Sequence, residues 1–291
     1  MALNISVFVV TYNSARCIEA CLESILRQKE TSFEVIVVDN ASCDDTLRSF
    51  GRDGVSVVES KENLGFGRAC NLAFAQSRGK LVFCLNPDAE LVNDYALREI
   101  CRNMERNPRW GLAGTKVMSH AGHLESPPAF EYPGQKHVRR DFSKLPGDIA
   151  WVIGASMVVR SDVYQQLGGF DPDYFLYSEE TDLCLRTRKL GYEIGWMEDV
   201  VVRHIGGESE RDADPYGVSR RKLSGLLTFR CKHYSKDECV FLARRDLSRA
   251  LFRMVTNRIR AIFRRRRSKY WAKYRMYRGI WETSREYLQS L

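Results

Sequence analysis

Continuous apolar runs alternate with amphipathic segments along the first 110 residues. The apolar runs predict buried strands at residues 5–10, 33–38, 55–58 and 80–85. Apolar positions three and four apart predict helices between them, at residues 14–26, 44–50, 66–77 and 95–106. Ser14 is the expected cap of the first of these helices, and Ser42 or Asp44 the expected cap of the second. This alternation predicts an α/β fold with an open, mostly parallel sheet flanked by helices on both sides.

The pattern weakens after Gly111. Residues 119–148 show little periodicity, and a loop of this length inside a compact domain is typical of a lid or a binding loop. A strand is predicted again at 151–159, a helix at 182–189 and an extended segment at 192–202. From Pro215 onward the pattern is helical and increasingly basic. The sequence therefore predicts a large α/β domain at residues 1–212 and a helical, strongly basic C-terminal extension at residues 213–291.

Length and composition fit this organisation. The 291 residues, 44% of them hydrophobic, suffice for one large α/β domain with an appendage. Apolar runs stay well short of the roughly 20 residues that a spanning helix needs, and no basic region precedes an apolar stretch at the N-terminus, so we expect neither a membrane span nor a signal peptide. None of the nine cysteines forms a C-x2-C pair, so we interpret them as reduced residues of the core.

Positive charge is concentrated at the C-terminal end. Residues 244–291 hold fifteen Lys and Arg against three acids, whereas the rest of the chain is mildly acidic. This asymmetry indicates an anionic partner for the tail. Two stripes at helical spacing flank Arg264-Arg265-Arg266-Arg267: Leu251, Val255, Ile259, Ile262 and Phe263 before it, and Tyr270, Tyr274, Tyr277 and Trp281 after it.

Three interpretations of the tail remain open. Basic and aromatic residues on one helix suit the headgroup layer of an anionic membrane. The same helices can instead dock on the domain through their aromatic side chains. Nucleic-acid binding, a function of another class, also fits basic patches with interleaved aromatics, but it leaves the acidic clusters described next without a purpose, so we regard it as unlikely.

Polar clusters follow the predicted strands at their ends. Thr11 and Asn13 follow the first strand, Asp39 the second, and Asn86-Pro87-Asp88 the fourth. Because the carboxyl ends of parallel strands converge on one crevice, these side chains are expected to line a ligand site. Each of them alone also fits a turn or a helix cap. Asp88 suits a divalent cation that bridges two phosphates, Mg²⁺ or Mn²⁺, which take oxygen ligands.

A glycine-containing segment, Asn63-Leu64-Gly65-Phe66-Gly67-Arg68, follows the third strand. The third glycine of a dinucleotide fingerprint is absent, since Cys70 stands there. We interpret the segment as a turn that admits a ribose and a diphosphate near a helix start. Arg68 is a candidate phosphate contact, with a solvated helix face as the alternative.

Acidic residues cluster at Glu179, Glu180 and Asp182. Three carboxylates this close repel one another, so partial burial would raise the pKa of at least one and suit it to general-base chemistry. An acidic helix start, favoured by the helix dipole, is the alternative. His204, ahead of two glycines, can approach a metal or a phosphate, or can be structural.

Eight segments, in order across residues 4–210, resemble glycosyltransferase family 2. They are Val10-Thr11-Tyr12-Asn13, Val38-Asp39-Asn40-Ala41-Ser42, residues 63–71, Asn86-Pro87-Asp88, Gly154-Ala155-Ser156-Met157, Gly168-Gly169-Phe170-Asp171 with residues 177–186, and His204-Ile205-Gly206-Gly207. The chain is most similar to the rhamnosyltransferase-like branch, which builds bacterial O-antigen and cell-wall glycans.

The resemblance implies a GT-A fold and an inverting, metal-dependent transfer of a sugar from a nucleotide-sugar donor. It implies the following roles. Thr11, Asn13 and Asp39 hold the nucleoside, with Asn63, Gly65, Arg68 and Asn86 also on the nucleotide-sugar side; Asp88 and His204 bind Mg²⁺ or Mn²⁺; Glu180 is the base, with Glu179 and Asp182 as rivals; and Trp151, Gly154, Ala155 and Ser156 line the acceptor side together with the loop at 119–148. Two positions depart from the family pattern: Asn86 replaces the first acid of the metal motif, and Glu180 replaces the more usual Asp.

The branch further implies dTDP-rhamnose as donor, with a UDP-hexose as the alternative. The acceptor would be a glycan or a polyprenyl-diphosphate-linked glycan in the synthesis of lipopolysaccharide or another cell-surface polysaccharide. We accordingly expect a cytoplasmic protein that lies peripherally on the inner face of the cell membrane. A non-catalytic binding module of the same fold is the alternative.

Overall fold

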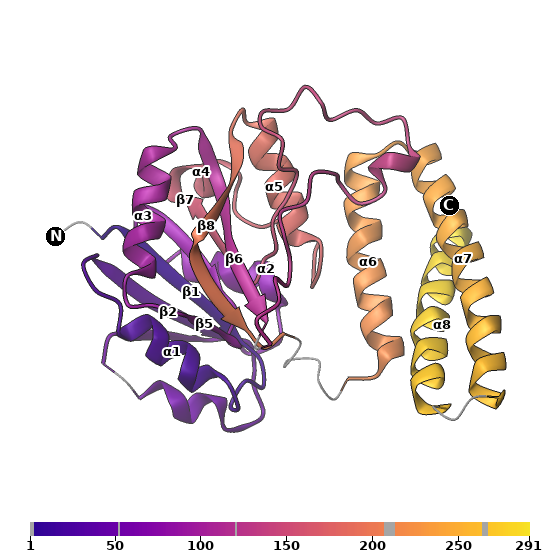
Figure 1. The fold of residues 1–291 in the computed structure, drawn as a ribbon, viewed down its shortest axis with the longest axis horizontal. Coiled ribbons are helices and arrows are strands. Elements are labelled where there is room, and N and C mark those ends of the chain that lie inside the picture. Colours follow the sequence, from indigo (N-terminus) through magenta and orange to yellow (C-terminus); the bar gives the residue numbers. More distant parts are fainter. Residues whose placement is uncertain (1–2, 52, 120, 207–212, 264–266) are drawn as a thin grey trace. The chain divides into compact units, whose positions relative to one another are not determined.

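The computed structural model describes residues 3–51, 53–119, 121–206, 213–263 and 267–291. The chain divides into two compact units (Figure 1). The first, here called the sheet unit, comprises Met1–Tyr132, Phe142–Phe175 and Glu179–Ser209. The second, the helical unit, comprises Pro133–Asp141, Leu176–Ser178 and Glu210–Leu291. The predicted domain boundary after residue 212 lies outside the described residues.

One eight-stranded sheet forms the centre of the sheet unit (Figure 1). In spatial order its strands are β3 (Val55–Glu59), β2 (Phe33–Asp39), β1 (Ile5–Thr11), β4 (Leu81–Leu85), β7 (Ser156–Arg160), β6 (Trp110–Ser119), β8 (Glu193–His204) and β5 (Ala89–Leu91). The first four run parallel, β6 and β8 are parallel to each other, and β7 and β5 run opposite to their neighbours. The predicted α/β architecture with a mostly parallel sheet is confirmed.

Helices bury apolar faces against both sides of this sheet. Alternate residues of β1 belong to two different clusters: Ile5, Val7 and Val9 to one, and Phe8 and Val10 to the other. The first cluster includes the apolar faces of α1 (Ile18–Leu26) and α3 (Ala96–Arg106), and the second those of α2 (Phe66–Phe74), α4 (Ser161–Gln166) and α5 (Glu179–Lys189). This period-two division is the reason why the central strands are apolar throughout.

The first helix begins later than the sequence pattern predicts. α1 starts at Ile18, with Cys17 rather than Ser14 in the capping position. The backbone amide of Ser14 instead donates to the Thr46 hydroxyl at 2.7 Å, and its carbonyl accepts from the amides of Cys17 and Ile18. The 3₁₀ helix η1 (Asp45–Phe50) does have the expected cap, since Asp44 accepts from the Thr46 amide.

Around the middle of the chain one strand was missed and one predicted strand was wrong in its bounds. Residues 110–119 form the ten-residue strand β6, where the sequence pattern had weakened. The strand predicted at 151–159 is shorter and shifted, because β7 covers only Ser156–Arg160 and Trp151 forms an isolated bridge with Ala129.

Three long helices make up most of the helical unit: α6 (Pro215–His233), α7 (Lys236–Phe263) and α8 (Arg267–Gln289). α8 packs along both α6 and α7. The apolar stripe predicted on α7 is exposed, with Phe263 80% accessible, whereas Tyr270, Tyr274 and Tyr277 on α8 are partly buried. Arg264, Arg265 and Arg266 lie outside the described residues. None of the helices that the structure describes combines the length and the apolar character needed to cross a membrane.

Candidate active site

Thr11 and Asp39 lie side by side at the ends of two neighbouring strands. The parallel register of β1 and β2 pairs them directly, and the Thr11 hydroxyl donates to Asp39 Oδ1 at 2.9 Å. The Ser42 hydroxyl donates to the same oxygen at 2.6 Å, and the Ser42 amide donates to Oδ2 at 2.9 Å. Three donors therefore fix the Asp39 carboxylate, which is 2% exposed, so that a ligand meets a preset acceptor group rather than a mobile one.

Asn13 extends this arrangement on the other side of Ser42. Its backbone has a positive φ of 52°, which asparagine tolerates better than most residues. Its amide donates to the Ser42 hydroxyl at 2.9 Å, and its side-chain oxygen accepts from the Cys43 amide at 2.9 Å. Hydrogen bonds from Asn13 to Ser42 and Cys43 thus join the loop that follows β1 to the loop that follows β2.

The loop before α2 is held to the end of β2 by two asparagines. The Asn40 side chain donates to Asn63 Oδ1 at 3.0 Å and to the Gly65 carbonyl at 3.1 Å, and it accepts from the Leu64 amide at 2.8 Å. Gly65 has a φ of 82°, and a Cβ there would lie 1.9 Å from the Phe175 carbonyl oxygen. Only glycine fits this close approach, so the segment acts as a rigid turn rather than as a flexible loop.

Asp88 and His204 meet at the other end of the strand row. The antiparallel pairing of β5 with β8 sets His204 beside residue 89, and its Nε2 is 3.1 Å from Asp88 Oδ1. Both side chains are about 95% buried, each being 5% exposed. The Asn86 side-chain amide is 3.4 Å from the same ring nitrogen. The structure therefore brings together Asp88 and His204, the two residues predicted to bind the cation, and places Asn86, predicted on the nucleotide-sugar side, beside them.

A fourth residue of this cluster, Glu125, was missed by the sequence analysis. Its Oε2 is 2.8 Å from His204 Nδ1. The turn that carries it is fixed by backbone hydrogen bonds, because the Glu125 amide donates to the Val117 carbonyl and the Ser119 amide to the His123 carbonyl. Burial acts to lower the pKa of His204, but hydrogen bonds and charge from Asp88 and Glu125 outweigh it and raise this pKa above its usual value.

A divalent cation is compatible with this residue set. A carboxylate oxygen suits Mn²⁺ and Mg²⁺ alike, an imidazole nitrogen suits the softer Mn²⁺ better than Mg²⁺, and a carboxylate on the second ring nitrogen orients such a histidine. Within the described ranges no group of three or more His, Cys, Asp or Glu has the arrangement of a complete metal site. The remaining ligands would therefore have to come from water and from the phosphates of a bound substrate, which is how Mg²⁺ is usually held.

The acidic cluster forms the first turn of α5, and its three carboxylates have different surroundings. Glu179 is 5% exposed, and its Oε2 has no hydrogen-bond partner among the residues that the structure describes. Burial, and then the neighbouring Glu180, raise the pKa of Glu179 well above its usual value. Asp182 is 1% exposed and pairs at 2.6 Å with Arg186, which also donates to the carbonyls of Leu167 and Gly169.

Glu180 is the member of the cluster that lies beside the predicted acceptor segment. A methyl group placed on Gly154 would be 3.4 Å from Glu180 Cβ and 3.9 Å from the Phe66 ring. Glu180 is partly exposed, and its Oε1 accepts from the Thr181 hydroxyl at 3.4 Å. Glu180 thus combines proximity to Gly154 with access to solvent, which Glu179 and Asp182 do not have.

The remaining predicted site residues have structural contacts of their own. Arg68 Nε donates to the Pro172 carbonyl at 2.7 Å. Trp151 Nε1 donates to the Glu131 carbonyl at 3.1 Å, and the Ala155 carbonyl accepts from the Asn86 amide at 2.9 Å. Ser156 is fully buried and shares a hydrogen bond of 2.7 Å with Thr115. Its hydroxyl is therefore directed to the neighbouring strand β6.

Asp39 thus ends β2, Gly65 lies between β3 and α2, Asp88 lies between β4 and β5 against His204 at the end of β8, and Glu180 lies in the first turn of α5. The family model of glycosyl transferase family 2 matches residues 6–168, more than half of the chain. The chain belongs to this family.

Relatives of this chain include two rhamnosyltransferases. It is 26% identical over 234 residues to the N-acetylglucosaminyl-diphospho-decaprenol L-rhamnosyltransferase of Mycobacterium tuberculosis, covering 68% of this chain and 75% of that protein. It is 26% identical over 211 residues to the O-antigen chain rhamnosyltransferase WbaN of Salmonella anatum, covering 68% and 65%. The uncharacterized protein y4gI of Sinorhizobium fredii is 30% identical over 230 residues, which are 72% of this chain but only a quarter, 25%, of that longer protein.

Solved structures confirm the GT-A fold. Residues 1–349 of S. aureus TarS, in complex with UDP, match with a TM-score of 0.59 at 18% identity, over 99% of this chain and 92% of that one. The mannosyltransferase PcManGT from Pyrobaculum calidifontis, in complex with GDP-Man and Mn²⁺, matches with a TM-score of 0.58 at 17% identity, over 99% and 88%.

Proposed function

We propose that this protein is an inverting, metal-dependent glycosyltransferase that moves a sugar from a nucleotide-sugar donor to a glycan or lipid-linked glycan acceptor. The observation that carries the proposal is that Asp39 ends β2, that Asp88 and His204 meet where β5 begins and β8 ends, and that Glu180 lies in the first turn of α5 against Gly154, all in the sheet unit. Together these groups offer an acceptor for a nucleobase, ligands for a diphosphate-bound cation, and a general base.

Two features of the site support the donor side of this proposal. The Asp39 carboxylate is held by three donors and can accept from a pyrimidine N3–H, while the cross-linked loops of Asn13 and Ser42 support the base and the ribose. Asn63 and Gly65 are joined to the end of β2 through Asn40, and Asn86 is next to His204, so we assign these three residues to the ribose and the diphosphate. We propose dTDP-rhamnose as the donor, because two relatives are rhamnosyltransferases; a UDP-hexose is the second candidate.

Mg²⁺ or Mn²⁺ would be held by Asp88 and His204, with Glu125 fixing the ring of His204 from behind. When bound, the cation supplies positive charge that offsets the charge developing on the nucleoside diphosphate. The buried carboxylate and the oriented imidazole keep this place dry and preset, which lowers the reorganisation needed when charge develops.

We assign the general base to Glu180. Its neighbour Asp182 is already paired with Arg186, and Glu179 is buried, whereas Glu180 lies against Gly154 on the predicted acceptor side. Glu180 would accept the proton of the acceptor hydroxyl as this oxygen bonds to the anomeric carbon and the bond from that carbon to the diphosphate breaks on the opposite face. One such displacement inverts the anomeric configuration.

The name of one relative supports the proposed acceptor, and the surface of the helical tail supports the proposed location of the protein. One relative is named for a diphospho-decaprenol substrate, and the exposed apolar positions of α7 together with its arginines suit the surface of an anionic membrane. We therefore propose a polyprenyl-diphosphate-linked acceptor and a peripheral position on the cytoplasmic face of the cell membrane, in the synthesis of a cell-surface polysaccharide.

Donor turnover by the purified protein tests the proposal. The protein would be incubated with dTDP-rhamnose, UDP-glucose, UDP-galactose and UDP-GlcNAc, with Mn²⁺ or Mg²⁺ and with EDTA, and release of the nucleoside diphosphate would be measured. Release from one donor that EDTA abolishes and Glu180→Gln reduces by about 10²–10⁴-fold is expected. Donor release that is equally fast in Glu180→Gln would refute the assignment of the base, and binding without turnover of any donor, even with lipid-linked acceptors present, would favour a non-catalytic module.

A further inference from the structure

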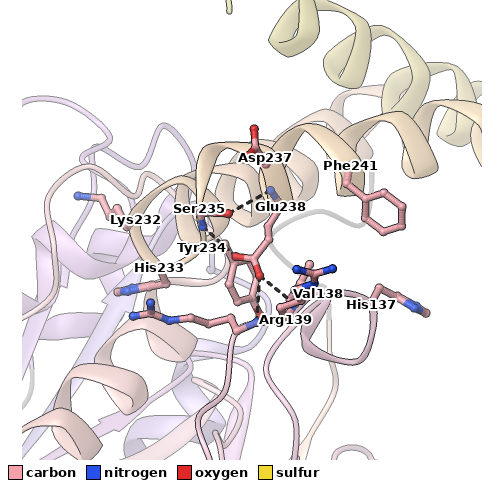
Figure 2. A pocket seen from close by; sticks show the side chains of 11 residues that line it. His137, Val138, Arg139, Lys232, His233, Tyr234, Ser235, Asp237, Glu238 and Phe241 are labelled. Atoms are coloured by element: carbon pink, nitrogen blue, oxygen red, sulfur yellow. Dashed lines mark hydrogen bonds between the residues drawn. The ribbon is translucent and has the colours of Figure 1, made fainter.

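A basic cavity lies within the helical unit, between the segment at 133–141 and the junction of α6 with α7 (Figure 2). Its volume is about 940 Å³. Its lining contains three residues with permanent positive charge, Arg139, Arg140 and Lys232, and two histidines, His137 and His233. Two acidic residues, Asp237 and Glu238, complete the set of charged groups.

The Glu238 carboxylate is engaged with backbone amides of the cavity wall. Oε1 of Glu238 accepts from the amides of Arg139 and Arg140, each at 2.9 Å, and Oε2 accepts from the Ser235 amide at 2.9 Å (Figure 2). Burial acts to raise the pKa of Glu238, but these hydrogen bonds outweigh it and lower this pKa below its usual value. The Asp237 side chain points away from Glu238. An incoming anion therefore meets cationic side chains whose main chain is already fixed.

The cavity wall is preset in other ways as well. The Tyr234 hydroxyl donates to the Pro133 carbonyl at 3.1 Å, which anchors the start of the segment at 133–141. His233 and Tyr234 are each only 7% exposed, and the His233 ring packs on Phe229 with 4.8 Å between ring centroids. A rigid wall lowers the entropic cost of binding a small anion.

The exposed apolar side of α7 supports a membrane lipid as the molecule that carries this anion. Phe241 lines the cavity and is 53% exposed. Ile259 follows eighteen residues later, which is five helical turns, so that it shares the face of Phe241. The exposed side chains of Phe252, Val255 and Phe263 extend this face. A helix lying flat on a membrane through this face would hold the cavity at the level of the lipid headgroups.

We propose that this cavity binds a phosphate or diphosphate group carried by a membrane lipid. The guanidinium groups of Arg139 and Arg140 suit phosphate oxygens, which they can meet in bidentate geometry. The carrier rests on the membrane partner proposed above, whereas the phosphate site does not depend on the transfer reaction.

Vesicle sedimentation with the full chain tests the site. Phosphatidylcholine vesicles would contain either phosphatidic acid, which has a terminal phosphate, or phosphatidylglycerol at matched surface charge. The wild type is expected to prefer phosphatidic acid. The double variant Arg139→Gln/Arg140→Gln is expected to lose about tenfold or more on phosphatidic acid and to lose its preference. The control Arg102→Gln/Arg106→Gln, which removes the same charge from the exposed side of α3, is expected to bind like the wild type.

Calorimetric titration with inorganic diphosphate provides a second arm that needs neither membrane nor donor. Binding that is lost in the double variant, with an unchanged melting temperature, supports the phosphate site even if the vesicles fail, and a vesicle failure then assigns the site to a soluble phosphate. Equal behaviour of the wild type and the double variant with both probes overturns the proposal. Loss of sugar transfer with intact diphosphate binding instead speaks against the proposed function alone.

Discussion

Replacement of Glu179 by glutamine should remove a pH-dependent penalty from the fold. The carboxyl group is 5% exposed, its Oε2 has no partner among the described residues, and its pKa is raised by burial and by Glu180. The folded protein therefore binds a proton that the unfolded chain releases at about pH 4.3. The stability contributed by this proton is complete below the unfolded pKa and is lost as the pH rises through the folded pKa.

The size of the effect follows from linkage. One proton of difference between the two states changes the free energy of unfolding by about 1.4 kcal/mol per pH unit over that window. For a chain of this size, 1 kcal/mol corresponds to about 2–4 °C in melting temperature. Glu179→Gln, which preserves the shape and cannot ionise, should therefore gain about 3–6 °C on the wild type for each pH unit of the window.

Melting temperatures measured by fluorescence between pH 5 and pH 8 would check this expectation. The difference between the variant and the wild type should widen as the pH rises, whatever its value at pH 5. Glu105→Gln, on the exposed side of α3, serves as the control and should follow the wild type at every pH. Parallel curves for Glu179→Gln and the wild type would show that the buried group ionises in the folded protein without cost, and would refute the reasoning.

Three further predictions concern other parts of the site. Glu125→Gln should weaken Mn²⁺ binding about 10–100-fold, because His204 loses the carboxylate that orients it. Titration calorimetry with the metal alone would measure this, and an unchanged affinity would contradict the orienting role of Glu125. Gly65→Ala should strongly lower the urea midpoint, since its Cβ would lie 1.9 Å from a carbonyl oxygen. Gly168 also has a positive φ but open space around it, so a loss just as large in Gly168→Ala would exclude the steric cause. Asp182→Asn should cost about 3–5 kcal/mol in urea denaturation, because a largely buried guanidinium loses its negative counter-charge, and a loss below 1 kcal/mol would contradict this.

The positions at which strands end could be predicted because they depend on residues that are neighbours in the sequence. An apolar run followed by a polar side chain indicates where a buried strand reaches the sheet edge, and so Thr11, Asp39 and Asp88 were found without a structure. The parallel register of β1 and β2 then made Thr11 and Asp39 neighbours, which no local pattern states. The order of the strands was the part that the rhythm of the sequence could not specify.

β6 was missed because its packing demands small residues. A Cβ on Gly111 would lie 2.7 Å from Tyr192, and one on Gly114 would lie 2.7 Å from Val152. Glycines at such close approaches make a central strand resemble a loop in the sequence. Glu125 was missed for a different reason: its partner His204 is 79 positions away, and a single acid in an aperiodic segment has no local signal.

Residues 133–141 belong to the helical unit although the sheet unit flanks them in sequence. The hydroxyl of Tyr234 and the carboxylate of Glu238 satisfy backbone groups of this excursion. A gene fusion that replaced only the C-terminal helices would leave those groups unpaired. Recombination that exchanges the tail must therefore exchange the excursion with it, and the two stretches should change together among relatives that differ in their C-terminal helices.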